Sequence, residues 1–261
     1  DYFPTRFQNN ILNKIYHLID KLCVGFADET WNVSGVMVDA REQYGHMDRK
    51  IYNRQHTVPV GIWYDSAPRK TFSEINKKKL IFAGHLLPHM GVDLVIKSMP
   101  EILEKIPDAK LEIIGGGEEE NRLKKLAQEL GVLNSVKFWG WVRDRDKLEK
   151  IMSDGAVGLA TFNTEILDDK VRNADPGKIK DYMLLGMPVI ATDAISTADA
   201  IEKAKCGIII RYNTSNFADT VVKLLNNLDM LKEKKENALK YVSQFDYDDI
   251  FNKNLSRVFP D

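Results

Sequence analysis

Lys178 and Asp181 are the residues of this sequence whose types and spacing best suit binding chemistry. Before them, Asp175 suits the N-cap of a helix and Pro176 its first position. Free amides and the helix dipole near Gly177 would attract an anion. A spacing of three places the lysine and the aspartate on one helix face. A cation, free amides and a carboxylate within one turn can hold a phosphate and a hydroxylated ring, although a solvated ion pair between the two side chains is an equal alternative.

A second candidate is the loop from Gly84 to Gly91, which follows a predicted strand. Glycines let a backbone approach a ligand closely at the carboxyl end of a strand. His85 and His89 are the polar side chains of the loop. Their spacing would suit a metal only on a helix, which Pro88 opposes, and the loop lacks a carboxylate or thiol. The loop therefore indicates a ligand contact and no metal.

Two further glycine turns follow predicted strands. Gly115-Gly116-Gly117 lacks the third glycine of the GxGxxG pattern, and Glu118-Glu119-Glu120 would repel a pyrophosphate, so the segment predicts a tight turn and no dinucleotide site. Trp139-Gly140-Trp141-Val142 offers aromatic rings and backbone groups that could cradle a nucleobase. Burial in the core explains its aromatic residues nearly as well.

Composition and missing motifs exclude several classes of protein. The 37 lysine and arginine residues balance 38 aspartates and glutamates, so no overall basic field exists to attract nucleic acid or an anionic membrane. Cys23 and Cys206 have no partners at zinc-ligand spacing, which argues against a zinc module or a disulfide scaffold. The GxSxG and GxxxxGK[ST] patterns are absent. No apolar run is long enough for a transmembrane segment.

The elements that must position the candidate residues alternate between short apolar runs and longer amphipathic ones, which is typical of an α/β protein with a parallel sheet. The apolar runs predict strands at Leu80–Ala83, Lys110–Ile114, Val136–Trp139, Ala156–Ala160, Pro188–Ala191 and Gly207–Ile210. The amphipathic runs predict helices at Val92–Lys105, Glu119–Leu130, Asp146–Ser153, Lys178–Leu185, Ser196–Ala204 and Ser215–Leu228. Together they predict a Rossmann-like, doubly wound parallel sheet, which binds ligands at the carboxyl ends of its strands.

The chain of 261 residues divides into four predicted parts. Residues 1–65 begin without Met and almost at once show a helical pattern, so they look like the remnant of another domain. Residues 66–79 form a linker, and residues 80–229 form the Rossmann-like domain. Residues 230–261 predict C-terminal helices that pack back on the N-terminal remnant.

The order of these motifs resembles the donor-binding, C-terminal half of a retaining GT-B glycosyltransferase of the group 1, family 4-like kind. The resemblance covers about residues 78–225, and residues 1–65 more weakly resemble the end of the acceptor half. It is carried by Phe82-Ala83-Gly84, Gly91-Val92-Asp93, Leu111–Gly117, Val136–Val142 and Asp175–Thr192.

The resemblance implies roles for individual residues. Asp181 occupies the position of the acidic residue that binds the nucleotide ribose. Lys178, the amides near Gly177 and His85 would stabilise the diphosphate, with Gly84 letting the backbone approach it. Preorganised charge of this kind suits a departing diphosphate, so no metal or other cofactor is expected.

Other positions depart from the family pattern. The usual donor-sugar carboxylate falls on Asn173, which together with Asp175 would face the sugar. The loop from Gly84 to Gly91, which follows the first strand of the domain, is called the first loop. The lysine and the arginine that usually bind the diphosphate in this loop fall on Met90 and His85, so both of these common cations are missing. The base would meet the backbone of Val142 beside Gly140.

The resemblance implies a glycosyltransferase that moves a sugar from a nucleoside-diphosphate sugar to an acceptor with retention. The expected partners are the nucleotide sugar and a glycan or lipid-linked acceptor held by a missing N-terminal domain, with no nucleic acid and no transmembrane segment. The expected location is cytoplasmic, with peripheral attachment at the inner membrane face left open for the full-length protein. The present chain alone is expected to be inactive. A noncatalytic nucleotide-sugar binding module and a nonhydrolysing sugar-nucleotide epimerase remain alternatives.

Overall fold

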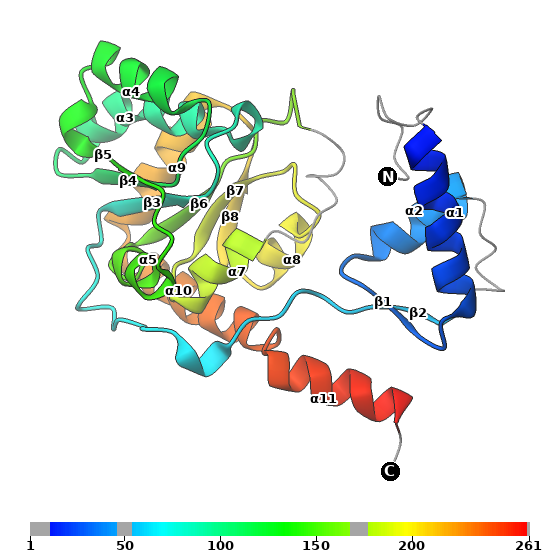
Figure 1. Ribbon diagram of the computed structural model, residues 1–261. Helices are drawn as coiled ribbons and strands as arrows, with labels where there is room; N and C mark the ends of the chain where they lie inside the picture. The colour runs from blue at the N-terminus through cyan, green and yellow to red at the C-terminus, as the bar shows by residue number, and fades with distance from the viewer. Residues whose placement is uncertain (1–10, 46–53, 168–176, 260–261) are drawn as a thin grey trace. The chain divides into compact units, whose positions relative to one another are not determined.

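The computed structural model describes residues 11–45, 54–167 and 177–259 (Figure 1). These residues fall into two compact units. The large unit holds residues 62–167 and 177–246, and the small unit holds residues 11–45, 54–61 and 247–259. The candidate site belongs to the large unit.

The large unit is built on a six-stranded, fully parallel sheet in the order β5-β4-β3-β6-β7-β8. Its strands are β3 (Lys79–Ala83), β4 (Lys110–Ile114), β5 (Val136–Gly140), β6 (Val157–Ala160), β7 (Val189–Thr192) and β8 (Gly207–Ile210). The strand order reverses between β3 and β6, which is the Rossmann arrangement, and ligands of such sheets bind beside this switch point. The predicted fold class is confirmed.

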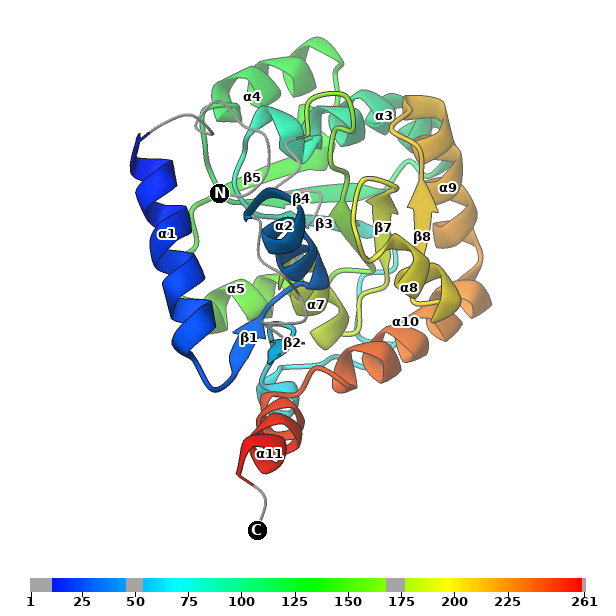
Figure 2. The ribbon, with the colours of Figure 1, turned by 90° about the vertical axis from the view of Figure 1, so that its right-hand side faces the viewer.

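Helices cover both faces of this sheet (Figures 1 and 2). They are α3 (Val92–Lys105), α4 (Glu120–Glu129), α5 (Arg145–Met152), α7 (Gly177–Leu184), α8 (Ala198–Lys203), α9 (Thr214–Asn226) and α10 (Leu228–Ser243). Because both faces are covered, the strands are runs of apolar residues: Leu80, Ile81 and Phe82 of β3 have no exposed surface. Each predicted strand and each predicted helix of this domain lies within two residues of its observed bounds.

Short 3₁₀ helices complete the large unit at Tyr64–Ser66, Pro88–Met90 and Leu133–Ser135. The second of them begins at the proline that the sequence placed in the first loop, and Gly91 ends it with a left-handed φ of 65°. No described helix is both long and apolar enough to cross a membrane.

The small unit contains α1 (Ile11–Phe26), β1 (Thr30–Asn32), α2 (Gly35–Gly45), β2 (Gln55–Thr57) and α11 (Tyr247–Val258). Strands β1 and β2 pair in parallel. The buried guanidinium of Arg41 bonds to Asp20, Asn32 and Gln55, and so joins both helices α1 and α2 to the two strands.

The two C-terminal helices belong to different units. α10 packs against α7 and α9 in the large unit, whereas α11 belongs to the small unit. Helix α10 therefore supports α7, the helix that carries Lys178 and Asp181. The prediction that the C-terminal helices pack back on the N-terminal residues is wrong for α10. The predicted domain limits stay a prediction.

Candidate functional site

A cavity of about 240 Å³ lies where the carboxyl ends of β3, β4 and β5 meet helices α5 and α7. Its lining includes four of the predicted site residues: Gly84, Val142, Lys178 and Asp181. They come from three separate segments of the chain. The fold therefore brings them together at the end of the sheet where a ligand is expected.

Lys178 supplies an unusual cation to this cavity. Its Nζ lies 3.4 Å from the sulfur of Met90, and it faces the rings of Phe82 and Phe162 at 4.7 Å and 5.1 Å from their centres. Burial lowers the pKa of the Lys178 ammonium to about 8. Its contacts within the described chain are a sulfur and two ring faces, so the ammonium has lost water without gaining a carboxylate partner there. Such a cation can bind an anion strongly.

Asp181 does not pair with Lys178 but with a residue of another helix. Its Oδ1 accepts a hydrogen bond of 2.8 Å from Nη2 of Arg145, at the start of α5. The alternative of a solvated pair between Lys178 and Asp181 is therefore wrong. The lysine and the carboxylate lie on one helix face, as the spacing predicts, and each remains available to a ligand in the cavity.

Tyr182 fixes the helix that carries both residues. Its fully buried hydroxyl accepts a hydrogen bond of 2.7 Å from the amide of Ala83 and donates one of 3.2 Å to the carbonyl of Leu159. A Cβ at Gly158 would lie 2.3 Å from the tyrosine ring, so only glycine leaves room for it. Burial raises the pKa of the Tyr182 hydroxyl. The tyrosine thus ties α7 to the ends of β3 and β6, a role that the sequence analysis missed.

The three consecutive glycines after β4 support the first loop. A Cβ at Gly115 would lie 2.0 Å from the carbonyl oxygen of Gly84, and one at Gly117 would lie 2.4 Å from that of Leu86. The amide of Leu86 donates to the carbonyl of Gly116 at 3.0 Å. This close approach of two backbones requires glycine, and it confirms a tight turn.

Aromatic residues lie at the edge of the cavity. The exposed rings of His85 and Trp141 meet edge to face, with centres 4.7 Å apart, and Trp141 lines the cavity beside Val142. Gly140 ends β5 with a left-handed φ of 65°. Within the described segments, no three His, Cys, Asp or Glu side chains come together as metal ligands would. Asn173 and Asp175 lie outside the described residues, and Gly177 is the exposed first residue of α7.

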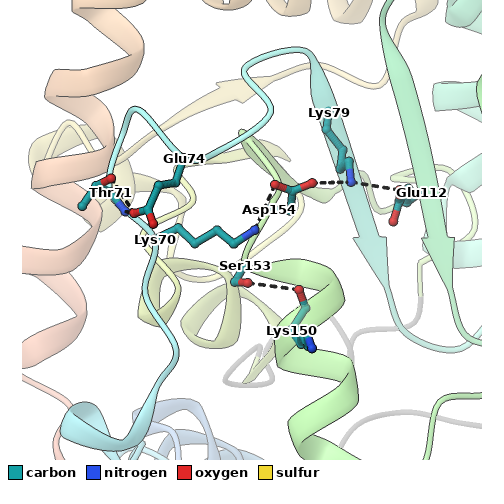
Figure 3. Close-up of polar contacts among 8 residues, drawn as sticks. All are labelled: Lys70, Thr71, Glu74, Lys79, Glu112, Lys150, Ser153 and Asp154. Atoms are coloured by element: carbon teal, nitrogen blue, oxygen red, sulfur yellow. Dashed lines mark hydrogen bonds and ion pairs between the residues drawn. The ribbon is translucent and has the colours of Figure 1, made fainter.

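A different set of charged residues gathers around Lys79 (Figure 3). Nζ of Lys79, at the amino end of β3, lies 2.7 Å from Asp154 and 3.0 Å from Glu112, and Lys70 approaches Asp154 at 3.1 Å. Burial alone would lower the pKa of Lys79, but hydrogen bonds to Asp154 and Glu112 raise it. Burial likewise opposes ionisation of Asp154, yet hydrogen bonds from the two lysines lower its pKa. The network ties the turn after α5 to the sheet.

Comparison with solved structures identifies the architecture. The chain superposes on WaaG, a glycosyltransferase involved in lipopolysaccharide biosynthesis, with a TM-score of 0.71 and 18% identity over 98% of this chain and 70% of that one. HepE from Anabaena, in complex with UDP and glucose, gives a TM-score of 0.73 at 18% identity over 95% of this chain and 67% of that one. The fold is that of a GT-B glycosyltransferase.

Sequence comparison then gives the family. The chain belongs to the glycosyl transferases of group 1, a family that matches residues 65–241. An uncharacterized glycosyltransferase of Haemophilus influenzae is 25% identical over 170 residues, which are 65% of this chain and 43% of that protein. A GDP-mannose-dependent mannosyltransferase of Mycobacterium tuberculosis that acts on a phosphatidylinositol monomannoside is 26% identical over 162 residues, 62% of this chain and 42% of the relative. The chain thus spans less than half the length of these relatives.

Proposed function

We propose that this chain is the donor-binding part of a glycosyltransferase that takes a sugar from a nucleoside-diphosphate sugar and transfers it with retention. The observation that carries the proposal is the desolvated ammonium of Lys178 in the wall of the cavity, one helical turn from Asp181. The lining also includes the apolar side chains of Leu148 and Met152 from α5. A ligand that suits this cavity has a flat apolar part, hydroxyl groups and a compact negative charge, as a nucleoside diphosphate does.

The ligand lies with its diphosphate at Lys178 and Gly84 in this proposal. The sulfur of Met90 stands where the family resemblance expects a lysine, and the amine of Lys178 reaches within 3.4 Å of that sulfur. The cation of α7 can therefore replace the missing cation of the first loop. The amides of the first turn of α7, which begins at Gly177, would add to the attraction for the diphosphate, and His85 is a further proposed contact.

The ribose would lie against Asp181, whose carboxylate accepts hydrogen bonds from sugar hydroxyl groups. The base would contact the backbone around Val142 and Gly140. Both the carboxylate and the valine line the same cavity, so one nucleoside can reach both. Two solved structures of Anabaena HepE give a parallel, since they hold UDP and UDP-glucose.

The chemical task is to stabilise a departing diphosphate while the sugar becomes oxocarbenium-like. Charge fixed beside the leaving group favours the transition state over the bound substrate, and so lowers the barrier. Lys178 would supply that charge. Asn173 and Asp175 would face the sugar. The acceptor, a glycan or a lipid-linked sugar, would bind to a part of a longer protein, so this chain alone should bind donor without efficient transfer.

Calorimetry with UDP-, GDP- and ADP-sugars tests the proposal directly. We expect one of the three classes to bind saturably, and Lys178→Met to weaken that binding. Lys147→Met, which removes an exposed lysine of α5, serves as the matched control and should leave binding unchanged. Failure of all three donors to bind would contradict the proposal. Binding without turnover in a full-length protein supplied with acceptors would instead favour a noncatalytic binding module.

A further inference from the structure

Helix α5 forms a thinly supported wall of the cavity. Arg145, Lys147 and Lys150 are exposed, and of its residues only Met152 is buried. Leu148 and Met152 nevertheless line the cavity. A helix with so little buried surface gains little positional restraint from packing, so its polar contacts matter more than usual.

Arg145, the first residue of α5, makes two such contacts. Its Nη2 donates to Asp181 Oδ1 at 2.8 Å, and its Nε donates to Glu149 one turn along the same helix. Burial opposes the charged form, but the hydrogen bonds to Asp181 and Glu149 raise the pKa of Arg145. The guanidinium is therefore a permanent cation held by carboxylates from two helices.

This ion pair contributes little to the stability of the fold. The Arg145 side chain is 53% exposed and that of Asp181 is 33% exposed, and pairs in such contact with water are weak. Its geometry is more informative than its energy. Only Oδ1 of Asp181 is engaged, so Oδ2 keeps its acceptor capacity free within the described chain. An aspartate held by one oxygen is restrained in direction while the other oxygen remains available.

We propose that Arg145 is a positioning residue for the nucleoside: it holds the Asp181 carboxylate in the direction that meets the ribose hydroxyl groups. The inference rests on the proposed function. Arg145 also follows Val142 by three residues, so it links the loop expected to hold the base to the carboxylate expected to hold the ribose. Fixing a side chain before the ligand arrives removes an entropy cost from binding.

Selective loss of ribose recognition is the expected signature. The probes are UDP and GDP, each compared by calorimetry with its 2′,3′-dideoxy analogue, on the 261-residue chain. For the nucleotide that binds, Arg145→Ala should weaken affinity about 3- to 10-fold, in line with the cost of ordering one or two side-chain torsions. Affinity for the dideoxy analogue should fall less than about 2-fold, because this analogue lacks the ribose hydroxyl groups that Asp181 would contact. The discrimination between ribose and dideoxyribose should therefore fall.

Two companion variants separate positioning from general damage. Arg145→Lys keeps a cation that can reach Asp181 and should restore part of the discrimination. Arg143→Ala removes another exposed arginine, from the loop just before α5, and should change neither affinity. Equal weakening of both ligands in Arg145→Ala would show a merely structural role and overturn the inference. Tighter binding of the ribonucleotide would overturn it too, since it would show that Arg145 competes with the ribose for Asp181.

A parallel Asp181→Ala variant distinguishes a failure of this inference from a failure of the proposed function. If Asp181→Ala lowers nucleotide affinity but Arg145→Ala does not, only the inference about Arg145 fails. If Asp181→Ala leaves affinity unchanged, or neither nucleotide binds, the proposed site itself is wrong and the inference falls with it.

Discussion

Lys79 and Lys178 are both drawn away from water in the large unit, but their surroundings are opposite. Lys79 lies between two carboxylates, and its pKa is raised. Lys178 lies among a sulfur and two aromatic rings, and its pKa falls to about 8. The first lysine completes its charge balance within the fold. The second keeps a charge that the described structure does not balance, which is typical of a residue reserved for a ligand.

The largest difference should appear in turnover. In a full-length enzyme, Lys178→Met removes the charge that faces the departing diphosphate, and one lost contact of this kind raises the barrier by about 3–4 kcal/mol. Affinity for the free nucleoside should change far less, because the nucleoside carries no phosphate. Steady-state kinetics together with calorimetry would measure both effects. Turnover within about twofold of the parent, with an unchanged circular dichroism spectrum, would contradict the assignment. Attention would then turn to Lys170 or Arg172, the basic residues that shortly precede Lys178 in the sequence.

Substitution of Lys79 should lower the stability of the fold. Lys79→Met leaves Glu112 with 12% of its side chain exposed and without its cation, so we expect the free energy of unfolding to fall by about 3 kcal/mol. Urea unfolding of the chain would measure this loss. Lys78→Met provides the control, since its partner Asp108 is well exposed and the pair contributes little. Equal losses in the two variants would show that burial of the Lys79 network adds nothing to the free energy of unfolding.

Ribose binding should be affected next. Asp181→Ala removes a hydrogen-bonding charge from the cavity and should weaken nucleotide binding by about 1.5–3 kcal/mol. Calorimetry with UDP or GDP gives the number. Asp146→Ala, which removes an exposed carboxylate from α5, should leave the affinity as it was.

The pH dependence sharpens the comparison further. The folded pKa of Lys178 is about 8, and the usual value near 10.5 applies to the unfolded chain, so between these values the unfolded state binds more protons. The contribution of this group therefore makes the fold more stable as pH rises through that window. Affinity for diphosphate should move the other way, with a loss of up to about tenfold for each pH unit above 8. Pyrophosphate titrations of the parent and Lys178→Met would test this, because the variant should lack that slope.

Periodicity was enough to predict the sheet, since buried parallel strands and amphipathic helices leave distinct patterns. The spacing of Lys178 and Asp181 also predicted that they share a helix face near the end of a strand. The partners of these residues could not be predicted from the sequence. Arg145 lies 36 residues before Asp181, and Tyr182 bonds to Ala83 across 99 residues. Such contacts depend on how the helices dock on the sheet, which single-sequence patterns do not encode. Lys79 was overlooked for the same reason, because its carboxylate partners come from distant segments.

The hydroxyl of Tyr182 makes one side of the cavity stiff, whereas the side formed by α5 is compliant. It joins α7 to the neighbouring ends of β3 and β6, so that wall cannot yield without breaking buried hydrogen bonds. Helix α5, which has only Met152 buried, also lines the cavity and can shift at lower cost. Adjustment to ligands of different width therefore falls to α5, while the cation and carboxylate on α7 keep a fixed separation. In the proposed complex, the side of the cavity formed by α7 would fix the distance between phosphate and ribose, and the side formed by α5 would tolerate variation at the base.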